Sequence, residues 1–306
     1  MTQDQDPNGD ILLFPIGTIS EKTGVKTVTL RAWERRYGLL KPQRTPKGHR
    51  LYSMDDIEHV KQVLQLLEQG IPVNRVRAIL DQPDAASTNL ISIANDSRAK
   101  EEDPWRYFTE HFTECIRALD SRSLDRAFNE ITSSYSLDLV ARKLVMPLYG
   151  ELQKNNSIFP VMGAEQAFFH EFLQAKLGAS YLRNNQNLPR THKSLVFKTG
   201  HQPLEVIRAL LLANIVDTHE YEVNFINHIA DMNALPLILQ RNSIDALILM
   251  DAQIDLAQID ILSQNHDVSI FVAHEHDAIE EPVNYYKLEQ DFSKASSQIN
   301  KQLSTS

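Results

Sequence analysis

Apolar positions along the chain follow three patterns in succession. The first 80 or so residues combine short helical segments with a stretch rich in Pro and Gly. From Pro104 to about residue 187, apolar residues recur every three or four positions, which predicts amphipathic helices. These helices are expected near residues 105–118, 121–132, 136–153 and 162–184. After Pro189, short β-rich runs alternate with helical segments, which predicts a parallel sheet with helices on both faces.

The N-terminal pattern predicts two short helices joined by a tight turn. Ile16, Ile19 and Val25 mark the first helix, and Gly24 is placed to end it. The second begins in a Thr-rich segment, carries Leu30 and Trp33 on one face and ends at Gly38. Such a pair is a helix-turn-helix.

The segment "LLKPQRTPKGHRLYS" follows, and its Pro42, Pro46 and Gly48 exclude a helix. We expect a short β-hairpin with a basic tip, which is a wing. Ser53 and the acidic residues after it then predict the start of another helix.

Together these patterns predict a multidomain α and α/β protein. It has an N-terminal winged helix-turn-helix, a central four-helix bundle and a C-terminal flavodoxin/Rossmann-like parallel sheet. The expected parts are a disordered tail (1–10), the winged helix-turn-helix (11–81), a polar linker (82–103), the bundle (104–187) and the sheet domain (188–306).

Charge is distributed unevenly along the chain, whose net charge is −9. Residues 26–50 hold eight Lys or Arg side chains against one acidic side chain, Glu34. A basic segment fused to an acidic body indicates a polyanion site confined to one end of the protein.

Other chemistries find little support in the sequence. The single cysteine, Cys115, is expected to be buried, and the lack of a second cysteine fits a reducing cytoplasm. No apolar run reaches the ~20 residues of a membrane span. The polar N-terminus is not a signal peptide. "HEHDAIEE" reads as a solvated acidic loop rather than a metal site, and "KTGHQP" lacks a nucleotide-binding glycine pattern. We find no catalytic set and expect a cytoplasmic protein that is not an enzyme.

The segment "TLRAWERRYGLLKPQRTPKGHRLYSMDDIEHV" resembles the DNA-binding domain of MerR-family transcription regulators, over about residues 11–81. The resemblance implies a winged helix-turn-helix that binds double-stranded DNA. It also implies a homodimer or tetramer on a pseudo-palindromic promoter site, in contact with RNA polymerase.

A recognition helix in the major groove presents side chains to base edges, while other side chains fix its position on phosphates. The expected base or groove contacts are Thr27, Thr29, Arg31 and Arg35. The expected phosphate contacts are Lys26, Arg36, Arg44, His49, Arg50 and Tyr52. We assign Leu30 and Trp33 to the core.

The order of the parts resembles a MerR branch that joins this domain to a bundle and a cobalamin-binding domain, as in light-responsive repressors. The cobalamin motifs depart from that pattern. The bundle motif keeps only Glu165, and "TGHQPL" keeps His201 but has Thr199 and Leu204 where the family has Asp and Gly. A ligating His needs a good acceptor on its other ring nitrogen, and a flat ring needs glycines to approach the backbone.

The sequence therefore predicts a regulator without a cofactor. One alternative is a cobalamin-dependent, light-sensing repressor that holds the cofactor through His201 and Glu165. A second is a regulator of another small effector, bound in a cavity lined by Tyr149, Phe168, Phe169 and Phe172. These aromatic residues would otherwise pack the bundle core.

Overall fold

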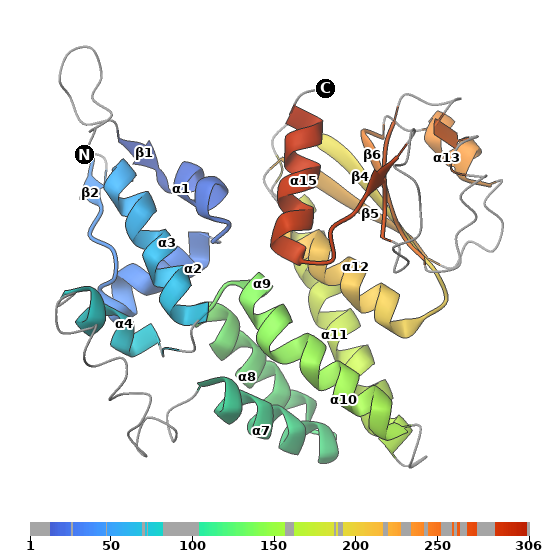
Figure 1. Cartoon of the computed structure of the whole chain (residues 1–306), viewed down its shortest axis with the longest axis horizontal. Coiled ribbons are helices and arrows are strands. Elements are labelled where there is room, and N and C mark those ends of the chain that lie inside the picture. The colour runs from blue at the N-terminus through green and yellow to red at the C-terminus, as the bar shows by residue number, and fades with distance from the viewer. Residues whose placement is uncertain are drawn as a thin grey trace. The chain divides into compact units, whose positions relative to one another are not determined.

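The structure is a computed structural model, shown in Figure 1, and it divides the chain into two compact units, residues 1–165 and 166–306. It describes residues 13–25, 27–46, 48–68, 71, 73–81, 104–156, 162–186, 188, 192–216, 220–227, 234–241, 244–251, 259, 262–263, 268–273 and 285–304. The tail and the linker expected from the sequence lie outside these residues. The first unit contains the helix-turn-helix and helical segments of the predicted bundle, and the second contains the parallel sheet.

The first part of unit 1 has the elements of a winged helix-turn-helix. Its helices are α1 (Ile16–Thr23), α2 (Thr27–Ala32), the π-helical turn η1 (Trp33–Tyr37), α3 (Met54–Glu68) and α4 (Val73–Leu80). Its strands are β1 (Phe14–Pro15), β2 (Gln43–Arg44) and β3 (Arg50–Tyr52), in the antiparallel order β1-β3-β2. The predicted helix-turn-helix and wing are confirmed, whereas β1 and the π-helical geometry of η1 were not predicted.

Two glycines end the helices where the sequence placed them. Gly24 and Gly38 have φ of 70° and 62°, and their backbone N–H groups donate to the carbonyls of Ser20 and Trp33. Glycine adopts this left-handed conformation without the steric cost that a Cβ brings. A Cβ on Gly38 would also lie 2.6 Å from Nη1 of Arg77 in α4. The positive φ is what requires glycine at this turn, because the exposed end of the Arg77 side chain can move away from a Cβ.

The rest of unit 1 is helical. Its segments are α7 (Pro104–Arg117), α8 (Ser121–Ser134), α9 (Leu137–Val140), the π-helical turn η2 (Ala141–Val145) and α10 (Met146–Asn156). Asp120 caps α8 by accepting hydrogen bonds from the N–H groups of Arg122 and Ser123. Cys115 is 5 % exposed, and burial is the main cause that raises the pKa of its thiol, so the predicted core position is confirmed.

Unit 2 contains a doubly wound sheet. Its helices are α11 (Met162–Asn185, from Gln166 onward), α12 (Pro203–Ile215), α13 (Leu235–Arg241) and α15 (Phe292–Ser304). Its strands are β4 (Lys193–Thr199), β5 (Tyr221–Asn227), β6 (Ala246–Met250), β7 (Ser269–Val272) and β8 (Tyr286–Lys287). All neighbouring strands are parallel, in the order β5-β4-β6-β7-β8. This is the flavodoxin-like order, with its switch point between β4 and β6.

Helices cover both faces of the sheet, as the sequence predicted. α12 packs against β4 and β6, and α15 packs against β7 and α12. Leu247 and Leu249 of β6 point to the opposite face, where they form a buried cluster with Leu235 of α13. Strand β8 was not predicted, because two residues give no recognisable period.

The outer strand β5 is held by a side chain of α11. The amide of Asn185 donates from Nδ2 to the carbonyl of Val223 at 2.7 Å and accepts at Oδ1 from its N–H at 3.0 Å. Asn185 therefore satisfies both backbone groups of one residue on the outer strand.

Gly38→Ala is expected to destabilise unit 1 by about 1–2 kcal/mol, because alanine pays the cost of a left-handed backbone. Fluorescence-monitored urea unfolding measures this, since both tryptophans, Trp33 and Trp105, lie in unit 1. Gly150→Ala is the matched control: this glycine lies inside α10 with open space around it, and the change should stabilise by about 0.5–1 kcal/mol. Equal effects of the two substitutions would contradict the role of the Gly38 turn.

Candidate nucleic-acid interface

The recognition segment, α2 and η1, separates a buried face from a charged one. Leu30 and Trp33 are 0 % exposed, which confirms their assignment to the core. Arg31 and Arg35 are exposed, and neither makes an ion pair within the residues that the structure describes. These two guanidinium groups are therefore available to a polyanion from the solvent side.

Glu34 joins the recognition segment to the wing. Its Oε2 accepts a hydrogen bond from Nε of Arg50 at 2.5 Å, and its Oε1 accepts from Nη2 of Arg50 at 3.2 Å. The same Oε1 accepts from Nη2 of Arg44 at 3.0 Å. One carboxylate thus orients an arginine from each strand of the hairpin, and the three side chains keep a net charge of +1. Charge-assisted pairs of this kind fix direction as well as distance.

The titration of this cluster follows from its geometry. Burial acts to raise the pKa of Glu34, but the hydrogen bonds and charges of Arg50 and Arg44 outweigh it, so the pKa is lowered. The hydrogen bond to Glu34 is the main cause that raises the pKa of Arg50. Because the folded-state pKa of Glu34 is depressed, the stability it contributes is present above its ordinary pKa and is lost as pH falls through the lowered value. The cluster therefore stays ionised at neutral pH.

Two of the expected DNA contacts are buried. Thr29 is 2 % exposed and Tyr52 is 0 % exposed, so neither side chain reaches the surface. The Tyr52 hydroxyl has no hydrogen-bond partner among the described residues, and burial, with the charge of Glu34, raises the pKa of Tyr52 to about 12. Both residues belong to the core of the domain, which the sequence pattern did not reveal because polar side chains occupy these positions.

The remaining expected contacts have different surroundings. Thr27 is half-buried at the start of α2, and His49 is exposed on the hairpin. Arg36 is exposed, and its Nη1 donates to Oγ of Ser133 in α8 at 3.1 Å. Lys26 lies outside the described residues. The structure therefore gathers Arg31, Arg35, Arg44, His49 and Arg50 on the recognition segment and the wing.

The sheet unit places two carboxylates at its switch point. Asp251, directly after β6, pairs with Nζ of Lys198, a residue of β4 that is 3 % exposed. A Cβ on Gly200 would lie 2.6 Å from Oδ1 of Asp251 and closer still to Oε2 of Glu205. This part-buried pair was not predicted from the sequence.

The residues suggested for a cofactor or effector belong partly to unit 1 and partly to unit 2. His201 is exposed just beyond β4, Thr199 is fully buried within β4, and Glu165 is half-buried in the first turn of α11. Tyr149 and Phe169 are both fully buried, and Phe168 and Phe172 are half-buried. Among the described residues no group of His, Cys, Asp and Glu could hold a metal ion. None of the helices described is long and apolar enough to cross a membrane.

The comparison with protein families agrees with the N-terminal geometry. Residues 14–83 match the model of the MerR HTH family regulatory protein. This segment of the chain is therefore similar to the helix-turn-helix domain of MerR-family regulators.

Several proteins with sequences similar to this chain are named as transcriptional regulators. The HTH-type transcriptional regulators MlrA of Salmonella typhimurium and Escherichia coli are 31 % identical over 141 residues, or 46 % of this chain and 52 % of theirs. The chain thus spans about half the length of these relatives. The HTH-type transcriptional repressor CarH of Myxococcus xanthus is 39 % identical over 69 residues, which is 22 % of this chain and 23 % of CarH.

One solved structure is also similar. It is a cobalamin-binding protein from Desulfitobacterium hafniense DCB-2 with 12 % identity and a TM-score of 0.27, covering 62 % of this chain and 95 % of that protein.

Glu34→Gln should weaken DNA binding by about tenfold, because the amide keeps the shape of the side chain but no longer orients Arg44 and Arg50 by charge. Fluorescence anisotropy with labelled duplexes measures the affinity. Glu58→Gln removes the same charge from an exposed pair with Lys61 in α3 and serves as the control. Tighter binding by Glu34→Gln would show that the Glu34 carboxylate only repels DNA and does not help by orienting the two arginines.

Proposed function

We propose that this protein is a transcription regulator that binds a specific, pseudo-palindromic DNA site as a dimer or higher oligomer. The observation that carries this proposal is the Glu34 cluster, which joins two wing arginines to the recognition segment on which Arg31 and Arg35 are exposed. Arginine is suited both to phosphates and to guanine edges. The MerR-type domain and the names of the relatives support the same function.

The two-fold operator follows from geometry. One domain presents a single recognition segment, and a dimer presents two that read related half-sites on the same face of DNA. Phosphate contacts by the wing would fix the register, and Arg31 would read bases. In a promoter, such a protein also contacts RNA polymerase.

Selection of duplexes from a randomised pool by the full chain tests the proposal. We expect recovery of an inverted repeat whose half-sites lie about one or two helical turns apart. On the selected site Arg31→Ala should lose about tenfold in affinity or more, with a smaller loss on unrelated DNA, since a good base contact is worth about 1–3 kcal/mol of discrimination.

Arg50→Ala is the comparison in the same assay. It should weaken binding to all sequences alike and lower the salt slope by about one. Recovery of no common sequence, or equal losses by Arg31→Ala on both kinds of DNA, would contradict sequence-specific reading.

We further propose that the protein works without cobalamin. At the switch point, where ligands of this fold bind, the space against Gly200 is filled by the carboxylates of Asp251 and Glu205. Lys198 neutralises Asp251 from within the strand, so the polar groups there satisfy one another. A large flat ring would have to displace these two carboxylates to approach the backbone here, and the exposed His201 has no acidic residue at position 199 to orient it.

Dark incubation with adenosylcobalamin followed by desalting should leave no visible absorption band with the protein. DNA affinity should be the same before and after illumination. Stoichiometric retention of the cofactor would instead support the light-sensing repressor, and His201→Ala would then show whether this residue is the ligand.

A further inference from the structure

The turn η1 has a second face, which does not point to the wing. Trp33, Arg36 and Tyr37 are three and four residues apart, a spacing that places side chains together on a helical surface. All three make hydrogen bonds to residues about one hundred positions further along the chain. Their partners, Ser133 and Ser134, form the C-terminal end of α8, which we call the seat.

The contacts at the seat are polar and range from a buried hydrogen bond at Trp33 to an exposed one at Arg36. Nε1 of Trp33 donates to the backbone carbonyl of Ser134 at 2.7 Å in a buried hydrogen bond. The hydroxyl of Tyr37 and Oγ of Ser134 are 3.1 Å apart, and Arg36 bonds to Ser133 as described above. Separating the two surfaces would leave an indole N–H and a carbonyl without partners unless water replaced both. The recognition segment is therefore held by the bundle through side chain and main chain together.

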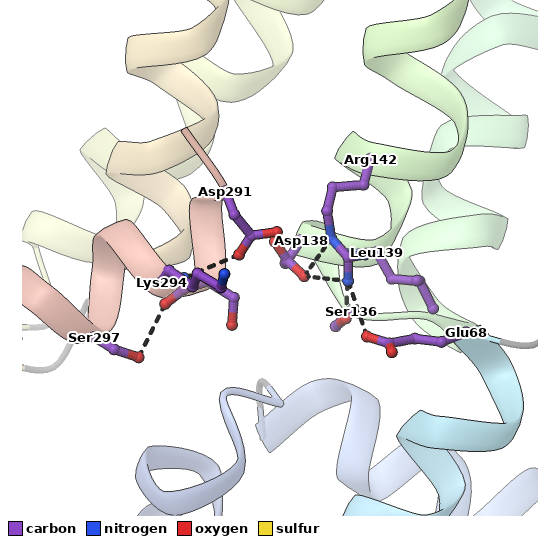
Figure 2. A network of polar contacts seen from close by, with 9 residues as sticks. Glu68, Ser136, Asp138, Leu139, Arg142, Asp291, Lys294 and Ser297 are labelled. Carbon is purple, nitrogen blue, oxygen red and sulfur yellow. Dashed lines mark hydrogen bonds and ion pairs between the residues drawn. The ribbon is translucent and has the colours of Figure 1, made fainter. Parts of the chain in front are cut away.

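A second contact joins the same parts of unit 1. Arg142 donates from Nη2 to Glu68 at the end of α3 at 3.1 Å and, from Nε and Nη2, to Asp138 at 3.2 and 3.0 Å (Figure 2). Exposed ion pairs of this kind contribute little energy alone. Here the Arg142–Glu68 pair joins the helix-turn-helix to the bundle at a second point. Two separated contacts prevent the helix-turn-helix from rotating about the seat.

Both contacts use a π-helical turn. Trp33, Arg36 and Tyr37 lie in η1, and Arg142 lies in η2. A π-helical turn widens a helix locally, changes the direction of its side chains and occurs frequently at functional sites. Within the residues that the structure describes, each π-helical turn thus meets the other part of unit 1.

We propose that the seat on α8 positions the recognition segment, so that the helical bundle sets the angle at which Arg31 and Arg35 meet DNA. On this proposal Arg36 bonds to Ser133 of the seat and does not contact a DNA phosphate. The inference rests on the proposed function, since it concerns how the same DNA-reading segment is held.

The seat and DNA can be engaged together. With the seat occupied, Arg31 and Arg35 are still exposed, so the bundle does not cover the charged face. The buried hydrogen bond between Trp33 and Ser134 argues against release on binding, because release would leave the indole N–H and the carbonyl to find other partners. A change within the bundle would thus reach the DNA-reading side chains through a direct contact.

A double-mutant cycle on the full chain tests the positioning role. Tyr37→Phe and Ser134→Ala each remove one hydroxyl and leave Trp33 in place. We expect each single variant to bind the selected duplex about fivefold more weakly, and the double variant also about fivefold rather than about 25-fold, because the two hydroxyls act as one pair. Urea unfolding followed by tryptophan fluorescence should show the same non-additivity without DNA.

Two adjacent arginines provide the matched comparison. Arg35→Ala should lower the salt slope of DNA binding by about one, whereas Arg36→Ala should leave the slope unchanged. Equal decreases in slope would overturn the assignment of Arg36 to the seat.

The outcomes separate this inference from the proposed function. If the chain selects no DNA sequence, the proposed function fails, and the unfolding cycle still decides whether the seat exists. Additive effects in unfolding would overturn the seat itself. Non-additivity in unfolding together with additive losses in DNA affinity would overturn its positioning role.

Discussion

Burial of Trp33 is the constraint on which the first unit depends. The ring belongs to the core of the helix-turn-helix, and its N–H reaches the carbonyl at the end of α8. One side chain therefore contributes both to the stability of the DNA-reading domain and to its attachment. A substitution there would affect folding and orientation together, which is why the polar neighbours of Trp33 are the better places to separate these effects.

Charge is arranged around this core with one acidic residue in a basic region. Glu34 lies one residue beyond Trp33, on the side of the wing. By pairing with Arg44 and Arg50 it reduces their mutual repulsion and limits the directions they can take, so less conformational entropy remains to be lost when they meet a phosphate. The exposed Arg31 and Arg35 keep their full charge for the encounter with DNA.

The sequence predicted the fold well where a hydrophobic repeat continued over a long helix and where a glycine marked a turn. Gly24 and Gly38 marked the helix ends, and the helices of residues 104–185 were found within a few residues. It failed for β1 and β8, which are too short to show a period, and for Thr29 and Tyr52, whose polar groups hid their burial. The seat and the Lys198–Asp251 pair join residues 101 and 53 positions apart, and a single sequence contains no signal for such pairs.

The amide of Asn185 on the outer strand has a consequence for how copies of this protein can associate. Strand edges with free backbone groups invite a further strand from another molecule. On β5 the N–H and carbonyl of Val223 already bond to Asn185 and cannot pair with another strand. Pairing of a further strand with β5 at Val223 is therefore disfavoured, and the proposed dimer would use other surfaces.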